Sequence, residues 1–455
     1  MEVRCFHLLR EAAPHRRHLD ALSRASRLKD PFSTFSFLEN FSRHDGYYPN
    51  DKNAEPWFLV AFENNQPIAY LPLRRIPDRI LGLESGKLEF FATHDTNCPY
   101  LVCRPEDEAR CGEAFLRYLL SRRGEWAWLD FHQQLEGSAL FPHPPRVDLG
   151  RYEVRAWPTR ESNVIDVRWS SLQQYFQALR GKFRTDLRKK FQTLLAAGEV
   201  SYVWSMDPKV TPVLFELMRP LERRTWRAGN RFAIDSHPDR VEYFRSLLAP
   251  RQPMRAHLGL LLLDRTPIAA SFSGEYEKTL QLMAIMYDEA FERLGPGAAV
   301  VLMTMRHAIE SGYRAVNFLS GFSYYKKRWL AESAPTVSGQ LIRKRSLRHL
   351  RLKLGDLKRR LRPGEAEDEL TWNPAHREAK LAARKASGEP DPEWIAALLA
   401  QLDAHARWLR HADLAALLEG TLAAQQKTKP ERPRPSAGGL SRTAPPTPGR
   451  PGLPR

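Results

Sequence analysis

The sequence predicts an α/β (α+β) protein of two tandem modules with mixed, mostly antiparallel sheets, followed by a helical extension and a tail. Two observations predict this class. "WFLVAFENNQPIAYLPL" (57–73) and "LGLLLLDRTPIAASFSG" (258–274) each indicate a strand, a polar turn, Pro-Ile-Ala and a second strand. Each copy then continues into further strand, a helix and a short strand, and such self-similarity is typical of a duplicated module.

The elements of the two copies follow in matching order. In the first copy we expect a helix near 106–122 and the strand "WAWLDF" at 126–131. In the second copy the patterns predict strands at 257–264, 267–275 and 278–287, a helix at 298–312 and a strand at 315–320.

The chain of 455 residues is long enough for two or three domains. We expect a first module at 1–160, a second at 161–340 and a helical extension at 341–426 with one or two helices at 390–420. Residues 427–455 contain eight prolines and almost nothing apolar, which predicts a disordered tail.

The formal charge of +17 is concentrated in appendages to the folded body. Residues 341–362 carry ten Lys and Arg against one acid, Asp356, and residues 427–455 carry seven against Glu431. Within 347–361 a leucine stripe follows helical spacing between basic residues (Leu347, Leu350, Leu354, Leu357 and Leu361). Such a helix packs its stripe onto the body or a partner helix, or binds an anionic lipid surface, or binds nucleic acid.

Several classes of protein are not supported by the sequence. No apolar run has the length of a membrane span, and the polar N-terminus does not read as a signal peptide, so we expect a cytoplasmic protein. The four cysteines lack CxxC spacing and fit reduced thiols. Because no HExxH, GxSxG or Walker motif and no metal-ligand spacing occurs, we expect no metal and no serine-hydrolase chemistry.

The stretch "DEAFERLGPGAAVVL" (288–302) places two glycines between a predicted strand and a predicted helix. Free amides and the positive end of the helix dipole make such a loop an anion site, and Arg293 adds a charged donor. The same letters also fit a tight strand-to-helix turn. If the loop binds an anion, its binding residues are Arg293, Leu294, Gly295, Pro296, Gly297 and Ala298.

This order of elements resembles the GNAT acyltransferase superfamily, whose [Q/R]xxGx[G/A] loop binds the pyrophosphate of an acyl-CoA. Gly295 and Gly297 match its last two fixed positions, whereas Glu292 occupies the first. The resemblance implies acetyl-CoA or another acyl-CoA as co-substrate, with Arg293 or backbone amides replacing the missing basic residue.

The second half looks more narrowly like the CelD-like branch of GNAT proteins, distantly related to Fem-type peptidoglycan transferases. The resemblance lies in "KFRTDLRKKFQTLLAAGEV" (182–200), "RRTWRAG" (223–229), "YDEAFERLGPG" (287–297) and "NFLSGFSYYKKRW" (317–329). In the last segment Gly321, Tyr325, Lys326 and Trp329 match the branch, and Asn317 stands where an aspartate is common.

Acyl transfer to an amine needs proton removal, an oxyanion donor and an acid for the leaving thiolate. The resemblance implies Tyr325 as that acid, with Tyr324 as the neighbouring alternative. Asp288 and Glu275, which end two predicted strands, are candidate bases, although water can also take the proton. Each of these residues equally fits a role in packing or on the surface.

Trp226 with Arg223, Arg224 and Arg227, and also Lys326, are candidates for substrate binding. A basic helix at 172–197 with one apolar row would steer an anionic acceptor, or simply be solvated. The first module has no GxG loop, so we assign it a scaffold role and place catalysis in the second module.

These observations lead to one hypothesis and two rivals. The hypothesis is an acyl-CoA-dependent N-acyltransferase, with an amino sugar or nucleotide-sugar of envelope or exopolysaccharide metabolism as acceptor. The rivals are a Fem-like aminoacyl-tRNA-dependent transferase and a degenerate, non-catalytic accessory protein. Residues 341–362 are expected to allow docking to a membrane surface or a protein, and nucleic acid is expected only as the tRNA of the first rival.

Overall fold

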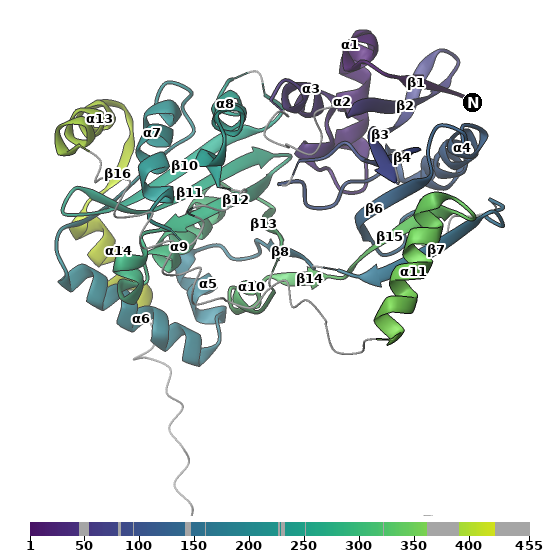
Figure 1. Cartoon of the computed structure of the whole chain (residues 1–455). Helices are drawn as coiled ribbons and strands as arrows, with labels where there is room; N and C mark the ends of the chain where they lie inside the picture. Colours follow the sequence, from purple (N-terminus) through teal and green to yellow (C-terminus); the bar gives the residue numbers. More distant parts are fainter. Residues whose placement is uncertain are drawn as a thin grey trace, which may run out of the picture.

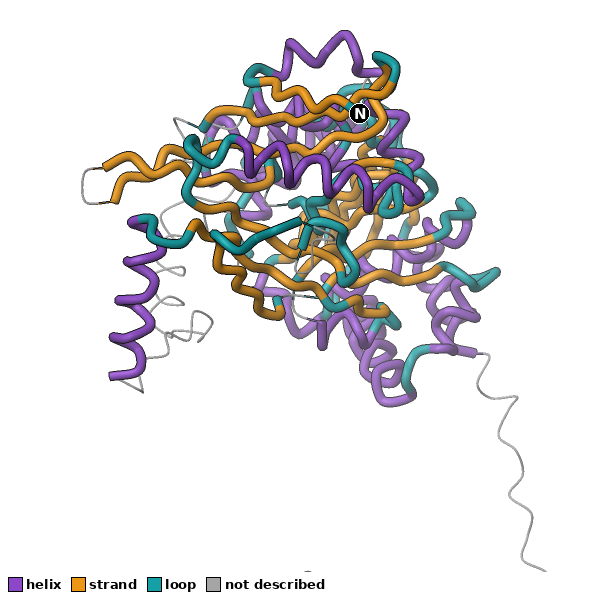
Figure 2. Tube along the Cα trace, turned by 90° about the vertical axis from the view of Figure 1, so that its right-hand side faces the viewer, coloured by secondary structure: helices purple, strands orange, loops and turns teal. Residues whose placement is uncertain are grey.

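The computed structural model describes residues 1–44, 54–80, 83–93, 95–141, 147–159, 161–225, 228, 233–250, 252–321, 323–361 and 391–423. Its strands form two mixed sheets, and helices lie against both of them (Figures 1 and 2). Each sheet contains one parallel pair among the described strands, and the other pairs are antiparallel. The predicted α/β class with mostly antiparallel sheets is confirmed.

The first sheet has the order β1-β2-β3-β4-β6-β15-β7, with β5 paired to β3. Its parallel pair is β4 with β6. The strands are β1 Glu2–Phe6, β2 Glu55–Glu63, β3 Gln66–Ile80, β4 Leu83–Phe90, β5 Val102–Cys103, β6 Trp128–Leu135, β7 Tyr152–Pro158 and β15 Thr336–Arg343. The helices of this half are α1 Leu9–Ala12, α2 Arg16–Ala25, α3 Phe35–Ser42, α4 Glu108–Ser121 and α11 Leu347–Leu361, with the short 3-10 helix η2 at Pro31–Ser33.

The second sheet has the order β14-β8-β13-β12-β11-β10-β9-β16, and its parallel pair is β12 with β13. The strands are β8 Ser162–Asp166, β9 Val200–Ser205, β10 Arg255–Leu263, β11 Thr266–Tyr276, β12 Thr279–Tyr287, β13 Ala315–Ser320, β14 Glu332–Ala334 and β16 Arg407–Leu409. The helices are α5 Leu172–Ala178, α6 Gly181–Ala196, α7 Thr211–Glu222, α8 Pro238–Ser246, α9 Pro296–Glu310, α10 Ser323–Arg328, α13 Pro392–His405 and α14 His411–Ala423, with a 3-10 turn η7 at Glu289–Leu294.

The predicted repeat is present in the details of the two hairpins. Asn64 and Asn65 form the β2–β3 turn, Asp264 and Arg265 form the β10–β11 turn, and all four have positive φ. Two-residue turns of this kind match the twist of the flanking strands. In both hairpins the register then shifts by one residue at the Pro-Ile-Ala segment. A third strand, a helix and a parallel fourth strand follow in each copy, as β4, α4, β6 and as β12, α9, β13.

The chain passes between the two sheets twice, at neighbouring points. It leaves the first sheet after β7 and returns from β14 to β15 (Figure 1). At the crossing, the Thr159 N–H donates to the Thr336 carbonyl at 2.9 Å, and the two hydroxyls lie 2.8 Å apart. The boundary that we expected at residue 340 therefore does not follow the sheets, because β15 lies between β6 and β7 of the first sheet.

One hydrophobic core extends across both halves of the molecule. The ring of Tyr243 in α8 packs edge-on against Phe37 and Phe41 of α3, with centroids 6.1 and 5.9 Å apart. Beside it, the fully buried guanidinium of Arg240 lies 3.6 Å from the Asp95 carboxylate of the first half. Apolar contact and a buried ion pair therefore hold α8 against the first module.

The single helix expected at 172–197 is two helices, α5 and α6. Leu179 adopts an extended conformation after α5, and α6 begins at Gly181, a residue that destabilises a helix interior. The apolar row nevertheless stays buried on both sides of the break: Phe176, Leu179, Phe183, Leu187, Phe191 and Leu194.

The one or two helices expected at 390–420 are two, α13 and α14, and they join the second half of the chain. Between them β16, which the sequence did not predict, pairs with the edge of β9. Leu399, Leu402 and Leu414 are buried in the cores on the two faces of this sheet. The tail predicted at 427–455 lies outside the described residues.

Helix α11 lies against the first sheet, and two leucines of its stripe are not buried there. Leu350 and Leu354 are 53% and 67% exposed, so these two side chains do not pack onto the body. The side towards the sheet is held instead by ion pairs of His349 and Lys353 with Glu153. Among the described helices we find none with the length and hydropathy of a membrane span.

Candidate active site

Strands β12 and β13 run parallel but separate after a short contact. They pair at three positions, from Thr279–Ala315 to Gln281–Asn317, and the rest of β12 has no partner on that edge among the described residues. On its other edge β12 pairs with β11 throughout, apart from a bulge at Met283. The two strands therefore enclose a wedge whose one wall is the free main-chain edge of residues 282–287.

The wedge opens beside the N-terminus of α9. The stretch after β12 forms η7, and Gly295 then takes a left-handed conformation (φ 66°) as the N-cap of α9. Its carbonyl accepts from the N–H groups of Ala298 and Ala299. The described residues supply no acceptor for the N–H of Gly297, so that amide and the helix dipole are directed at the same place.

The glycines of this loop are covered by two side chains. A Cβ at Gly295 would lie 2.7 Å from Cδ of Lys190, whose aliphatic stem lies over the turn. A Cβ at Gly297 would lie 2.9 Å from the ring of Tyr287, the last residue of β12. Gly295, Pro296 and Gly297 are buried, whereas Arg293 is exposed and Ala298 is half-buried. An anion at this loop therefore meets Arg293 and Lys190 at the rim first.

The end of β13 is held in an unusual shape by two side chains. Asn317 Oδ1 accepts the N–H of Leu319 at 2.8 Å, and Leu319 has a left-handed φ of 57°. The Lys326 ammonium donates to the carbonyls of Phe318, Leu319 and Ser320 at 2.7–3.0 Å. An aspartate at 317 could accept the same hydrogen bond from the N–H of Leu319, so asparagine can replace aspartate at this position.

The residues that build this wedge coincide with a family match. Residues 181–327, from the start of α6 into α10, match the acetyltransferase (GNAT) domain family. This part of the chain is a GNAT acetyltransferase domain. The match identifies the chain as a transferase. The matched residues include the wedge, the glycine loop and α9.

Several solved structures align with much of the chain at low identity. The C-terminal domain of a putative lysylphosphatidylglycerol synthetase from Agrobacterium fabrum is 14% identical, with 76% of this chain and 96% of that chain covered and a TM-score of 0.44. FemX is 9% identical, with 74% and 97% covered and a TM-score of 0.47. A tandem GNAT protein from the clavulanic acid pathway is 13% identical, with 76% and 100% covered and a TM-score of 0.44. No curated protein matches the chain.

Asp288, a predicted base, has both carboxylate oxygens engaged at the start of the GNAT loop. One oxygen accepts the N–H of Ala290 at 2.9 Å, and the other lies 3.3 Å from Nε of Arg224. Arg224 in turn donates to the carbonyl of Pro267 at 3.2 Å. Asp288 and Arg224 therefore brace the end of β12, which is a different arrangement from a free base with a separate substrate-binding arginine.

Glu275, the other predicted base, lies apart from the loop. It precedes the β11–β12 turn and pairs with Leu280, whereas the loop follows Tyr287 at the opposite end of β12. At the rise of a β-strand this separation is about 24 Å. Glu275 lies 3.4 Å from Arg255, so the structure separates it from Asp288 and from the expected site of transfer.

Tyr325, the predicted acid, lies on α10 near the loop and is 41% exposed. Its ring meets that of Trp329 edge-on at 6.5 Å. Desolvation around the hydroxyl, with a smaller contribution from Tyr287, raises the pKa of Tyr325 to about 12. The phenol is therefore protonated at neutral pH and can donate. Tyr324, the neighbouring alternative, points into solvent with 81% exposure.

The remaining substrate-binding predictions have mixed outcomes. Trp226 and Arg227 lie outside the described residues. Arg223 pairs with Asp235 at 2.6 Å, and Lys326 is bonded to the end of β13 as described above. Both side chains thus have structural partners in this arrangement.

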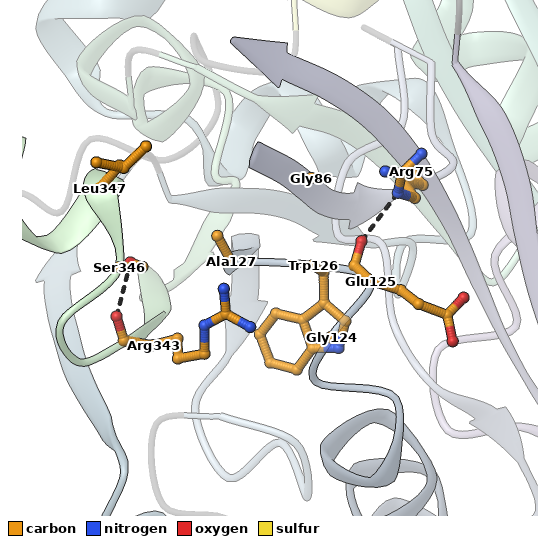
Figure 3. A pocket seen from close by; sticks show the side chains of 9 residues that line it. All are labelled: Arg75, Gly86, Gly124, Glu125, Trp126, Ala127, Arg343, Ser346 and Leu347. Carbon is orange, nitrogen blue, oxygen red and sulfur yellow. Dashed lines mark hydrogen bonds between the residues drawn. The ribbon is translucent and has the colours of Figure 1, made fainter. Parts of the chain in front are cut away.

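No group of three His, Cys, Asp or Glu with the geometry of a metal site occurs within the described ranges. A pocket of about 220 Å³ lies in the first half, away from the wedge, beside the first turn of α11. Figure 3 shows it between Arg75, Trp126, Arg343 and Leu347. Its arginines donate to main-chain carbonyls, Arg75 to Glu125 and Arg343 to Arg123.

Two contributors to the site were missed at the level of sequence. Lys190 appeared only as one of several basic residues off the apolar row of its helix, and Tyr287 only as the end of a strand. The available signal was the pair of glycines, since a missing side chain implies a neighbour that fills the space. Which neighbour fills it depends on packing between α6 and η7, and no local pattern encodes that contact.

Proposed function

We propose that the chain is an acyl-CoA-dependent N-acyltransferase of the CelD-like branch, and that it transfers an acetyl group to an amine. The acceptor class we favour is an amino sugar or nucleotide-sugar of envelope or exopolysaccharide metabolism, and we place the reaction in the cytoplasm. The observation that carries this proposal is the wedge between β12 and β13, which opens beside the N-terminus of α9.

The wedge suits the two chemical parts of an acyl-CoA. The amide-containing arm of the cofactor would bond to the free main-chain edge of residues 282–287 as an additional strand does. The pyrophosphate would lie at the α9 terminus, where the Gly297 amide, Arg293 and the Lys190 ammonium supply donors. Lys190 now pairs with Asp186 at 3.7 Å, a weak, half-exposed contact that its flexible stem can leave.

The transfer step follows from these positions. The amine nitrogen attacks the thioester carbonyl, a C–N bond forms, and the C–S bond then breaks to release the thiolate. Main-chain N–H groups of the wedge would stabilise the oxyanion, and the protonated Tyr325 would donate to the thiolate. Because Asp288 is engaged by Ala290 and Arg224, we assign removal of the amine proton to water.

Two observations favour the rival of a non-catalytic GNAT module. Gly295, Pro296 and Gly297 are covered, and neither predicted carboxylate base is free at the loop. This rival predicts no binding of acyl-CoA at all, and the tRNA-dependent rival predicts activity that ribonuclease removes.

Calorimetric titration of the full chain with acetyl-CoA tests the proposal. We expect micromolar binding, and about a tenfold weaker affinity for Lys190→Met, which keeps the stem over Gly295 and removes the charge. Lys182→Met is the matched control, because Lys182 is exposed on the same helix two turns earlier. Absence of binding, or equal weakening in both variants, contradicts the proposal.

A further inference from the structure

Helix α11 is attached to the first sheet by a side that carries ion pairs and one apolar contact, that of Leu352 with the cluster around Trp128. Lys353 and His349 each lie 2.9 Å from Glu153, and Asp356 lies 2.7 Å from Arg155, both on β7. These contacts are spaced by three and four residues, so they mark one side of the helix. The acidic groups on this face of β7 and on α11, Glu153 and Asp356, are therefore already neutralised by ion pairs within the protein.

Another side of α11 carries exposed leucines. Leu350 and Leu354 are the most exposed leucines among the described residues, at 53% and 67%. The helical period places them, with Leu347, about a third of a turn away from the ion-paired side. Trp157 lies on the same face of β7 as Glu153 and Arg155, beyond the Asp356 contact, and is 40% exposed. An apolar strip of leucines therefore faces outward, and Trp157 is exposed separately on the ion-paired side of the helix.

The charge around this strip is of one sign. Lys344, Arg345 and Arg351 are exposed beside the leucines. Residues 341–362 carry a net charge of +9, from ten Lys and Arg against Asp356, which is already paired. Exposed leucine flanked by uncompensated cations is the composition that anionic lipid headgroups and the adjoining acyl chains accommodate together.

Other occupants fit this surface less well. A second copy brought against it by a two-fold axis would place the same positive charge on both sides. A nucleic acid would neutralise the cations but would leave the leucines exposed to water. Residues 362–390 follow the helix and lie outside the described residues. They are an alternative occupant of this surface, which the experiment distinguishes from a lipid surface.

We propose that α11 docks the protein on an anionic lipid surface, with Leu350 and Leu354 in the interfacial layer and the basic residues on the headgroups. Binding is peripheral and reversible, because one short amphipathic helix supplies limited apolar area. The first module then holds the second, with its wedge, beside the membrane surface. This inference is independent of the acyl donor.

Co-sedimentation of the full chain with vesicles tests this surface. We expect binding to phosphatidylcholine vesicles that contain phosphatidylglycerol, little binding to phosphatidylcholine alone, and progressive release by salt. The double variant Leu350→Glu/Leu354→Glu should lower the partition coefficient at least about tenfold, because two apolar side chains are replaced by anions. Since both leucines are exposed, the variant should keep the wild-type melting temperature.

The matched control is Leu8→Glu, since Leu8 is also an exposed leucine, at 43%, but lies near the N-terminus away from α11. It should bind vesicles as the wild type does. Vesicle binding that the double variant leaves unchanged overturns the inference. So does a lower melting temperature without vesicle binding, which would identify residues 362–390 as the occupant, or a dimer that the variant converts to a monomer in light scattering.

Discussion

The two modules share a hairpin, a bulge and a parallel crossing strand, and they differ in the segment that follows the third strand. In the second module this segment is η7, which leads into α9 and leaves a wedge beside β12. In the first it is the loop 91–101, where Thr93, Asp95, Thr96 and Asn97 are all buried.

The buried loop of the first module turns its polar groups towards the second. Asn97 Nδ2 donates to Ser162 of β8 at 2.7 Å, and Asp95 lies 3.6 Å from Arg240 of α8. One position in a duplicated fold thus forms a strand-to-helix loop beside the wedge in one copy and a contact between the two copies in the other. The contrast between the two loops can be tested by substitutions in each module.

The largest expected effect is at the contact between Asp95 of the first module and Arg240 of the second. Arg240→Ala leaves the Asp95 carboxylate buried without its partner and should lower the free energy of unfolding by about 3–5 kcal/mol. Urea denaturation measures this loss. Arg245→Ala, on the same helix but 39% exposed in its side chain, is the control and should cost less than about 1 kcal/mol. Equal losses in the two variants would show that Arg240 does not bridge the modules.

A second prediction concerns pH and the first module. Burial raises the pKa of Asp30, which caps η2, to about 7. Because this pKa lies above the ordinary aspartate value, the folded state prefers the protonated form, and Asp30 destabilises the fold increasingly as pH rises from about 4 to 7. Asp30→Asn keeps the cap and removes the titration. Its stability relative to wild type should therefore improve by about 2 kcal/mol between pH 5 and pH 7 in urea melts.

A variant whose stability difference from wild type is the same at both pH values would contradict a titrating Asp30. Asp20→Asn, at a half-buried position of the same module, is the control variant, and its unfolding is measured at the same two pH values.

A third and smaller effect of opposite sign is expected in the second module. His257 of β10 stacks on His307 of α9 with centroids 4.3 Å apart, and burial lowers the pKa of His307 to about 4. The protonated form is disfavoured in the fold, so stability is lost as pH falls below the ordinary histidine pKa near 6.5. His307→Leu should gain about 1–2 kcal/mol over wild type between pH 7 and pH 5. His237→Leu, at an exposed histidine, should show no such gain.

The sequence was sufficient for the elements whose signals are local. The turns Asn64-Asn65 and Asp264-Arg265 interrupt apolar runs, and both hairpins were predicted on that basis. The strand-to-helix loop at Gly295–Gly297 was likewise predicted from glycines at a helix start. In these cases the residue that forces the backbone conformation lies within the segment itself.

The predictions that were missing or wrong concern elements and side chains whose partners are far away in sequence. Nothing near Thr336 indicates that β15 returns to the first sheet, and nothing near Arg407 indicates that β16 adds to β9. The leucine stripe of α11 looked like a packing surface, yet ion pairs with Glu153 and Arg155 hold the helix by its other side. In the site, Glu275 was expected near the reaction centre with Asp288 because both residues end strands, although antiparallel pairing puts those two strand ends at opposite ends of the hairpin.

The return of the chain at Thr336 has a consequence for biosynthesis. Strands β6 and β7 do not pair with each other, and the strand between them, β15, is translated only after residues 161–335. During synthesis the N-terminal sheet therefore remains incomplete until the inserted residues 161–335 have left the ribosome. Until then, the edges of β6 and β7 that later pair with β15 have no partner strand. Release of the nascent chain before residue 343 would leave both edges open to aggregation.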